Sequence, residues 1–479
     1  MHFFLQLTIQ TSLLSRYNQL MNSYPFEVIL KNKELILVQN KEIKFSKRKR
    51  ARFYSYTNAG LSIARKTFSS EKPIIGTEDE IIEKIHQIRF SPNNPYVITG
   101  GHFHQLYVRN LGIFYNALLD PRIPSSSLDW INRQKIVLKT IALDLEVFSL
   151  AKSQYTTIIP LAGNRYTCLN MYARPSDSLY AILYSLVALT TEGYIASLFP
   201  MQDYKTKRLQ TKSAGFLLIE KYTQLLQFLL GEYLTEIIDE KIGIIKKNIL
   251  LSSARDGIKR ESSFYDNVIA WATVVLAKRL GIFKISDAEI AGWKQNILQR
   301  FWNAKDKLFI DDLSNESVEQ RKFSADSFIV ISSGFLNPSI RQDRQYLQGM
   351  VEYVKNNKLD IPFPLHYSKN DSPQKLYRPV RYFAKSYMGK SIWSHWGMEY
   401  IKALILLSKS NPPYFREAKN HLESYRKNIE KYGGYPELYK PDGNIFSSRF
   451  YKSVLHNGWV VNYEQAKSML DSITIAKKN

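Results

Sequence analysis

The sequence predicts a mainly α protein, a ring of six antiparallel helix pairs called the (α/α)6 toroid, with a small N-terminal β-rich segment. From about residue 78, apolar residues recur with helical spacing in twelve segments. Short turns such as "LGIFKISDAE" and "KSNPPYF" alternate with long loops rich in Gly, Pro, Asn and aromatic residues. Short turns produce antiparallel pairs, so six consecutive pairs close into a ring with the long loops at one end.

The twelve predicted helices begin after a change of period. Thr77 is a plausible N-cap, and Glu80 follows three residues later, as in a capping box. The segments are 77–90, 104–119, 127–154, 177–196, 208–232, 262–280, 286–304, 323–335, 341–357, 393–409, 414–431 and 460–474. Residues 26–76 instead alternate with period two, which predicts two to four short strands. We therefore expect a β-rich segment over 1–76 and the toroid over 77–479.

Composition limits the classes of protein. The chain is 44% hydrophobic and 13% aromatic, as expected of a globular protein. Its one cysteine, Cys168, cannot form an internal disulfide or a thiolate metal cluster. The first residues have no basic residue before their apolar stretch, unlike a secretory signal, and 214–234 is too polar to span a membrane. We expect a cytoplasmic protein with no membrane partner.

The formal net charge of +23 raises the question of a nucleic-acid partner. Only residues 44–53 form a dense basic run, and the remaining Lys and Arg are scattered. Scattered charges are typical of solvated faces, so we expect no nucleic-acid partner. A continuous Lys/Arg stripe with salt-dependent binding would support the alternative, a basic nucleic-acid-binding helical protein.

Two of the long loops carry candidate binding residues. Tyr107, Arg109 and Asn110 follow a stretch of glycines and histidines, and a guanidinium offers a planar fork of donors to hydroxyls or a carboxylate. Asp177 stands at a predicted helix start, where its simplest role is an N-cap, although a substrate contact is the alternative. Arg109 has a corresponding alternative, an ion pair within the scaffold.

Two later loops carry carboxylates and aromatic rings. Asp256 lies in a turn among aromatics, with Glu261 five residues further on, and desolvation there would raise a carboxyl pKa as a general acid requires. Trp393, His395 and Trp396 stand at a helix start. Paired tryptophans are often core residues, but at a loop end their rings are also suited to stacking on a sugar.

The stretch "GGYPELY" at 433–439 places a carboxylate in a tightly determined backbone. Gly433 and Gly434 end a helix and Pro436 fixes the chain direction before Glu437. This setting suits a carboxylate that must be aimed, and Tyr435 beside it offers a ring.

Motifs for cofactors are missing from the sequence. His102 and His104 are two residues apart without a carboxylate at metal-site spacing, and there is no GxGxxG, Walker, GxSxG or DDxxD-like pattern. We therefore expect neither a cofactor nor a metal, which also argues against a terpenoid-cyclase-like toroid.

The order of these motifs resembles that of the six-hairpin glycosidases, which include trehalases, glucoamylases, processing α-glucosidases and the amylo-α-1,6-glucosidase part of glycogen debranching enzymes. The resemblance spans about residues 80–475. The stretches that carry it are "YVRNLGIFYNALLDPR", "RPSDSLYAILYSL", "RDGIKRESSFYDNVIAW", "SHWGMEYIKALI" and "GGYPELY".

The resemblance implies an inverting, exo-acting hydrolase of an α-glucoside or related oligosaccharide. Asp256 matches the general acid, with Glu261 in reserve, and Glu437 matches the base. Arg109 matches the Arg of a sugar-holding Arg-Asp pair, but Asn110 replaces the Asp, and an amide accepts weaker bonds than a carboxylate. The alternative is therefore a non-catalytic carbohydrate-binding or scaffold toroid that has lost activity.

Overall fold

The computed structural model describes most of the chain, and all structural statements below concern that part. The described residues are 25–31, 34–47, 71–91, 93–98, 105–120, 130–161, 163–172, 174–190, 214–239, 241–255, 257–315, 322–371, 375–376, 378, 381, 384, 386–448 and 451–478.

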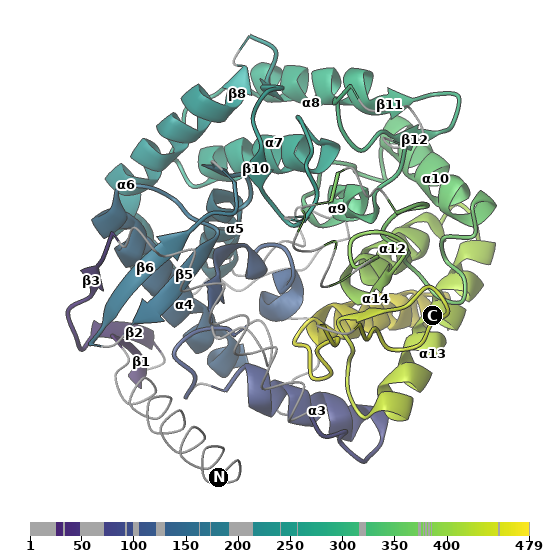
Figure 1. Ribbon diagram of the computed structural model, residues 1–479, viewed down its shortest axis with the longest axis horizontal. Coiled ribbons are helices and arrows are strands. Elements are labelled where there is room, and N and C mark those ends of the chain that lie inside the picture. The colour runs from purple at the N-terminus through teal and green to yellow at the C-terminus, as the bar shows by residue number, and fades with distance from the viewer. Residues whose placement is uncertain are drawn as a thin grey trace.

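The described residues form a mainly α (α/α)6 toroid (Figure 1). Six helices form the outer wall: α3 (Glu78–Arg89), α4 (Trp130–Ala151), α6 (Ala214–Ile237), α8 (Asp287–Phe301), α10 (Arg341–Asn356) and α13 (Pro413–Tyr432). The inner wall has six members: η1 and η2 (Val108–Asn110, Asn116–Leu119), α5 (Ser178–Thr190), α7 (Phe264–Arg279), η3 with α9 (Ala325–Phe328, Ile329–Ser332), α12 (Ser394–Leu407) and α14 (Val460–Lys478).

The inner wall closes on itself. Each inner member contacts the next, from η1 through α5, α7, η3–α9 and α12 to α14, and α14 contacts η2 again. Closure explains the burial pattern of the helices. The inner helix α5 is buried at every position from Ser178 to Leu189, whereas the outer helix α13 buries one stripe, Tyr414, Ala418, Leu422, Tyr425 and Ile429.

The helix boundaries confirm most of the predicted segments. Thr77 and Glu80 form the expected capping box, with the Thr77 N–H donating to Glu80 Oε2 at 2.7 Å. Gly433 ends α13 in the left-handed conformation at φ 58°, as a C-terminal glycine should. None of the described helices is both long and apolar enough to cross a membrane.

Two predicted helices were wrong in form. Segment 104–119 contains a two-residue strand and two 3-10 turns in its described residues, and 323–335 contains only short turns of helix. In the first case Gly112 packs directly on α5, where a Cβ would lie 2.4 Å from the Cα of Ala181. This close approach replaces regular helix by turns that still complete the inner wall.

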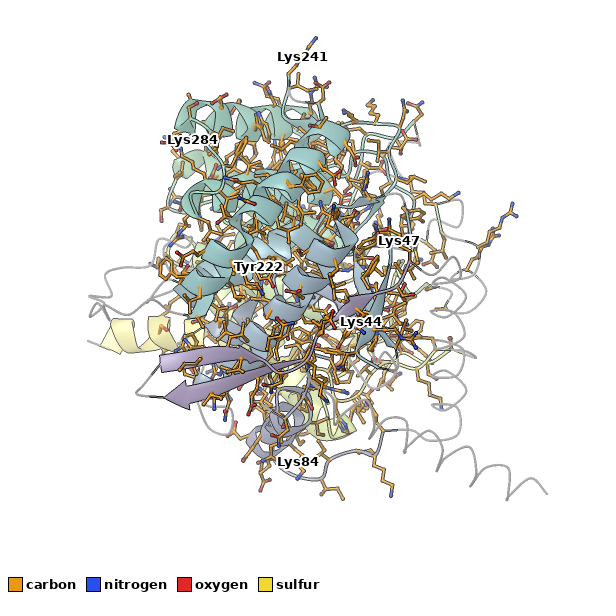
Figure 2. The ribbon with its side chains drawn as sticks, turned by 90° about the vertical axis from the view of Figure 1, so that its left-hand side faces the viewer. Lys44, Lys47, Lys84, Tyr222, Lys241 and Lys284 are labelled. Atoms are coloured by element: carbon orange, nitrogen blue, oxygen red, sulfur yellow. The ribbon has the colours of Figure 1, made fainter. Side chains whose placement is uncertain are left out.

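The N-terminal strands pack on the toroid. β1 (Phe26–Lys31) and β2 (Glu34–Gln39) form an antiparallel hairpin against α4, and Figure 2 shows this hairpin from the side. β3 (Lys44–Phe45) pairs in parallel with β6 (Arg165–Leu169), in a sheet ordered β3-β6-β5-β4 with β5 (Thr157–Leu161) and β4 (Leu106–Tyr107). The boundary at residue 76 stays a prediction. β3 pairs with a strand of a ring loop, and the β1–β2 hairpin packs on the outer wall.

With the N-terminal hairpin, the described chain has five two-stranded sheets. Two come from the hairpins β8 (Ile238–Asp239) with β9 (Ile244–Ile245) and β11 (Trp302–Asn303) with β12 (Leu308–Phe309). Two others link different loops, β7 (Arg174–Pro175) with β10 (Leu251–Ser252) and β13 (Ile392–Trp393) with β14 (Leu438–Tyr439). The fifth is the N-terminal hairpin. The inter-loop pairs fix the long connections relative to one another.

Candidate functional site

The candidate site lies where the six long connections from outer to inner helices meet. Each connection contributes at least one polar residue to a network of contacts between these loops. The residues include Arg109, Asp177, Arg255, Asp311, Tyr387 and Glu437. They are separated by up to 328 positions along the chain, yet the ring closure brings their loops together. Such a meeting of loops on a rigid scaffold is where binding and catalysis are commonly found.

The backbone of Glu437 is held from both sides. Its N–H donates to the Val454 carbonyl at 2.9 Å, and its carbonyl accepts from the N–H and the hydroxyl of Ser394 at 3.1 and 2.8 Å. The next residue, Leu438, begins β14 and pairs with Trp393 of β13. The glycine and proline setting read from the sequence therefore becomes a fixed loop position that aims the Glu437 side chain.

Two tyrosines hold the Glu437 carboxylate, which is 7% exposed. The Tyr387 hydroxyl donates to Oε1 at 3.4 Å and the Tyr451 hydroxyl donates to Oε2. Burial, and then the neighbouring Glu437 charge, raise the pKa of both hydroxyls well above the usual range. Both tyrosines therefore stay protonated and act as donors, which favours the ionised form of Glu437.

Arg109 and Asp177 form the second group of the site. Arg109 Nη1 donates to the Ser253 carbonyl and lies 3.8 Å from Asp177 Oδ2. Tyr265 of α7 donates its hydroxyl to the same Asp177 oxygen at 3.2 Å. The Asp177 side chain, directly before α5, therefore contacts Arg109 and Tyr265.

Two further arginines bind carboxylates in the neighbouring loops. Arg260 Nη1 lies 3.0 Å from Asp311 and 2.7 Å from Asp326, and Arg255 Nη1 lies 3.0 Å from the other Asp311 oxygen. Burial alone would raise the pKa of Asp311, but Arg260, Arg255 and Lys375 outweigh it and lower that pKa below its usual value. This cluster therefore keeps its charges although it is buried.

The two groups are joined through loop 251–255. Arg109 contacts Ser253 in this loop, and Arg255 Nη2 donates to the Met388 carbonyl at 2.7 Å, next to Tyr387. Tyr387 in turn donates to Glu437. A continuous series of contacts thus leads from Arg109 to Glu437, as expected if both serve one site.

Asp256, the predicted general acid, lies outside the described residues, as do His102 and His104. Its neighbours are placed, since Arg255 and Gly257 are both buried at the junction just described. The separation of the Asp256 and Glu437 carboxyls therefore stays a prediction. Glu261, the reserve acid, is half-buried, and its carbonyl accepts the Leu313 N–H at 3.0 Å.

A cavity of about 230 Å³ borders this junction. Arg255, Asp311, Phe323 and Lys375 contribute to its lining, together with residues 368–371. Glu437 does not line it, although Arg255 belongs both to the cavity and to the contacts that lead to Glu437. The cavity is therefore an adjoining space of the candidate site and does not contain the predicted base.

Most of the aromatic rings that we expect to stack on a sugar are buried in the structure. Trp396, His395 and Tyr435 are each 0% exposed and Trp393 is 3% exposed. His395 lies 4.5 to 5.7 Å, between ring centroids, from Phe114, Trp396 and Trp459, and burial lowers its pKa well below the usual range. Trp396, Trp393 and Tyr435 likewise pack against the rings of Phe114, Trp459 and Tyr425.

Among the aromatic residues that we expect to stack on a sugar, Tyr107 is the one that is only half-buried. Its hydroxyl lies 3.5 Å from the Gln105 side-chain oxygen. After burial and Glu437, Tyr107 also contributes to the raised pKa of Tyr387, so it lies near that tyrosine. Asn110 is buried in η1 next to Arg109.

Sequence reasoning missed several residues of the site. Arg255 and Arg260 flank the loop in which only the carboxylates Asp256 and Glu261 were selected, and Asp311 and Asp326 received no role. Tyr387 and Tyr451 lie in aromatic-rich loops and were also missed. The alternation of arginine and carboxylate in "ARDGIKRES" was the available signal, since buried arginines need acidic partners.

No family model matches the chain, and no curated protein matches it. Several solved structures are similar to the chain. A D-mannose isomerase is similar with a TM-score of 0.50 and 11% identity, over 82% of this chain and 97% of the isomerase chain. At this identity the likeness shows the fold alone.

Two glycoside hydrolases are similar at lower scores. A rhamnosidase from Klebsiella oxytoca with rhamnose bound has a TM-score of 0.49 and 12% identity, over 85% of this chain and 66% of its own. A Glycoside Hydrolase Family 15 glucoamylase from Hypocrea jecorina has a TM-score of 0.46 and 11% identity, over 88% and 72%. These scores add no argument about substrate or mechanism.

Figure 2 labels five of the lysines that contribute to the positive charge of the protein. Lys44, Lys47, Lys84, Lys241 and Lys284 lie apart from the top to the bottom of this face and are exposed.

Proposed function

We propose that the chain is an inverting, exo-acting glycoside hydrolase that cleaves an α-glucoside or related oligosaccharide, of the amylo-α-1,6-glucosidase, trehalase or processing α-glucosidase type. The observation that carries the proposal is the setting of Glu437. Its backbone is pinned by Ser394 and Val454, and its carboxylate receives two tyrosine hydroxyls where six loops meet. An ionised, aimed carboxylate is what a general base requires.

In this proposal Glu437 removes a proton from water as the water attacks the anomeric carbon. Asp256, from the loop beside Arg255, protonates the leaving glycosidic oxygen from the opposite face of the sugar. Inversion requires the two carboxyls about 6.5–9.5 Å apart, to leave room for the water. Tyr387 and Tyr451 hold Glu437 in its ionised form between turnovers.

Arg109, Asn110 and Asp177 bind the sugar in this proposal, and Tyr107 supplies the exposed ring face. The existing pair of Arg109 and Asp177 fixes the guanidinium, so that its remaining N–H groups have one direction. The Asn110 amide then donates one neutral hydrogen bond to the sugar and accepts another. The enzymes that the chain resembles have a carboxylate at this position. We expect sugar binding to be weaker than with an Arg-Asp pair.

The test is release of free sugar from a panel of trehalose, maltooligosaccharides and mannosides. On the glycoside that the native protein cleaves, Glu437→Gln and Asp256→Asn should each lower kcat by about 10²–10⁴-fold. Glu430→Gln is the matched control, because Glu430 is an exposed carboxylate of α13 paired with Arg426, and it should keep full turnover. Wild-type turnover in folded Glu437→Gln would refute the assignment.

A second candidate is a non-catalytic carbohydrate-binding toroid. The observation that favours it is the engagement of Arg109 with the Ser253 carbonyl and Asp177 inside the scaffold, together with Asn110. It predicts saturable binding of an oligosaccharide without product. Following aldose–ketose conversion in the same samples would detect an isomerase, the activity named for the similar structure with the 0.50 TM-score.

A further inference from the structure

A separate cluster of polar residues lies on the outer wall, where the connection after α10 meets α13. Asp360 follows α10 by four residues, and Glu417 and His421 are one turn apart on α13. Residues four apart share one face of a helix, so Glu417 and His421 point the same way. One ligand atom from each of the three residues lies within 4.8 Å of the other two.

The His421 ring directs Nε2 towards both carboxylates without a hydrogen bond to either. Nε2 lies 3.8 Å from Asp360 Oδ2 and 4.0 Å from Glu417 Oε1. The atom is buried, and it has no hydrogen-bond partner among the described residues. Buried polar atoms are almost always satisfied, so this nitrogen is available to a ligand between the three groups.

Two neighbours support the cluster from outside. The Tyr400 hydroxyl of α12 lies 3.5 Å from Asp360 Oδ2 and 3.4 Å from Glu417 Oε1. Lys355 binds the other Glu417 oxygen, Oε2, at 2.5 Å. Oε1 therefore faces Asp360 and His421, and a second group orients each carboxylate, as outer-shell partners do around metal ligands.

We propose that Asp360, Glu417 and His421 bind one Zn²⁺ ion. One imidazole nitrogen and two carboxylate oxygens form a three-ligand set that zinc accepts, with water in the fourth position. Zinc–ligand distances of about 2.0–2.2 Å place tetrahedral ligand atoms about 3.4 Å apart. The two His421 distances exceed this by only about half an ångström, which small rotamer changes can close.

The ion would tie the start of the fifth long connection to the outer helix α13. Asp360 leads directly into the segment whose Leu365 carbonyl accepts the Trp393 N–H at 3.0 Å. The zinc would thus act structurally, away from Glu437, and the inference does not depend on the proposed hydrolase activity. The helix spacing of Glu417 and His421 was visible in the sequence, but Asp360 lies 57 positions earlier and joins them only in the fold.

The test uses the full chain, stripped of metal with a chelator and then titrated with Zn²⁺ by calorimetry. We expect one site per chain and a zinc-dependent rise in Tm, because an ion that binds only the folded state stabilises it. His421→Gln should weaken binding at least about tenfold. Co²⁺ in place of Zn²⁺ should give the visible absorption of a tetrahedral N/O site, and His421→Gln should lose it.

Glu430→Gln is the matched control, because it removes an exposed carboxylate of α13 that pairs with Arg426 and takes no part in the cluster. It should bind zinc as tightly as the native protein. If the native chain shows no stoichiometric zinc, or if His421→Gln binds it equally well, the proposal is overturned, and the three residues are a polar cluster held by Tyr400 and Lys355.

Discussion

The helical wall and the loop network both bury carboxyl groups, but with opposite consequences. Asp144 on α4 is 1% exposed, and neither of its oxygens has a hydrogen-bond partner among the described residues, so burial raises its pKa well above the usual range. Asp311 in the loops is equally inaccessible, yet Arg260, Arg255 and Lys375 lower its pKa. Asp144 therefore lacks a hydrogen-bond partner among the described residues of the wall, whereas Asp311 is paired with buried cations where the loops meet.

The largest change in stability is expected when Arg260 is replaced. Arg260→Met should destabilise the protein by about 3–5 kcal/mol, because Asp311 and Asp326 would each lose a buried cationic partner. Urea unfolding followed by circular dichroism measures this. The double variant Arg260→Met with Asp326→Asn should recover part of the loss. A loss below about 1 kcal/mol in Arg260→Met would mean that water or other groups satisfy the two aspartates.

Replacement of Asp144 is expected to increase the stability of the protein. Asp144→Leu should raise the free energy of unfolding by about 1–3 kcal/mol at neutral pH, because an unpartnered buried polar group is replaced by an apolar one. The folded-state pKa of Asp144 lies above its unfolded value, so the native protein loses stability as pH rises between the two. The variant lacks this loss.

Denaturant titrations at about pH 4 and about pH 8 test whether the pKa of Asp144 is raised in the folded protein. The advantage of Asp144→Leu should be smaller at the lower pH, where the folded-state carboxyl is protonated and the unfolded-state carboxyl is only about half ionised. Asp144→Asn, which keeps the shape without titrating, should share the changed pH dependence. An advantage that grows towards acid pH would contradict the assignment of a raised pKa.

The smallest effect is expected in the aromatic core beneath the loops. Trp396→Phe should cost about 1–2 kcal/mol by leaving a small void. The Trp396 Nε1 has no hydrogen-bond partner in the described chain, so no bond is lost. Binding of any oligosaccharide should be unchanged when measured by calorimetry, because the ring is 0% exposed. Selective loss of sugar binding in a fully stable variant would restore Trp396 as a stacking residue.

Comparison of the expected and observed sites separates two kinds of information. The local stretch around Gly433 and Pro436 was sufficient to single out Glu437, because helix termination and a fixed φ are local properties. The roles of Trp396 and Tyr435 were not local. Whether the Trp396 ring is exposed or buried depends on neighbours such as Phe114, which lies 282 positions away in the sequence.

The sequence by itself determined the succession of helices, the alternation of short turns with long loops and therefore the closed ring, because these follow from periodicity and from turn residues. Only the tertiary structure decided which loop side chains pair. Arg260 lies 51 positions from Asp311 and 66 from Asp326, and Asp360 joins Glu417 and His421 across two outer helices. Such pairs depend on how the closed ring places its loops, and charge interactions act over a few ångströms in space whatever the separation along the chain.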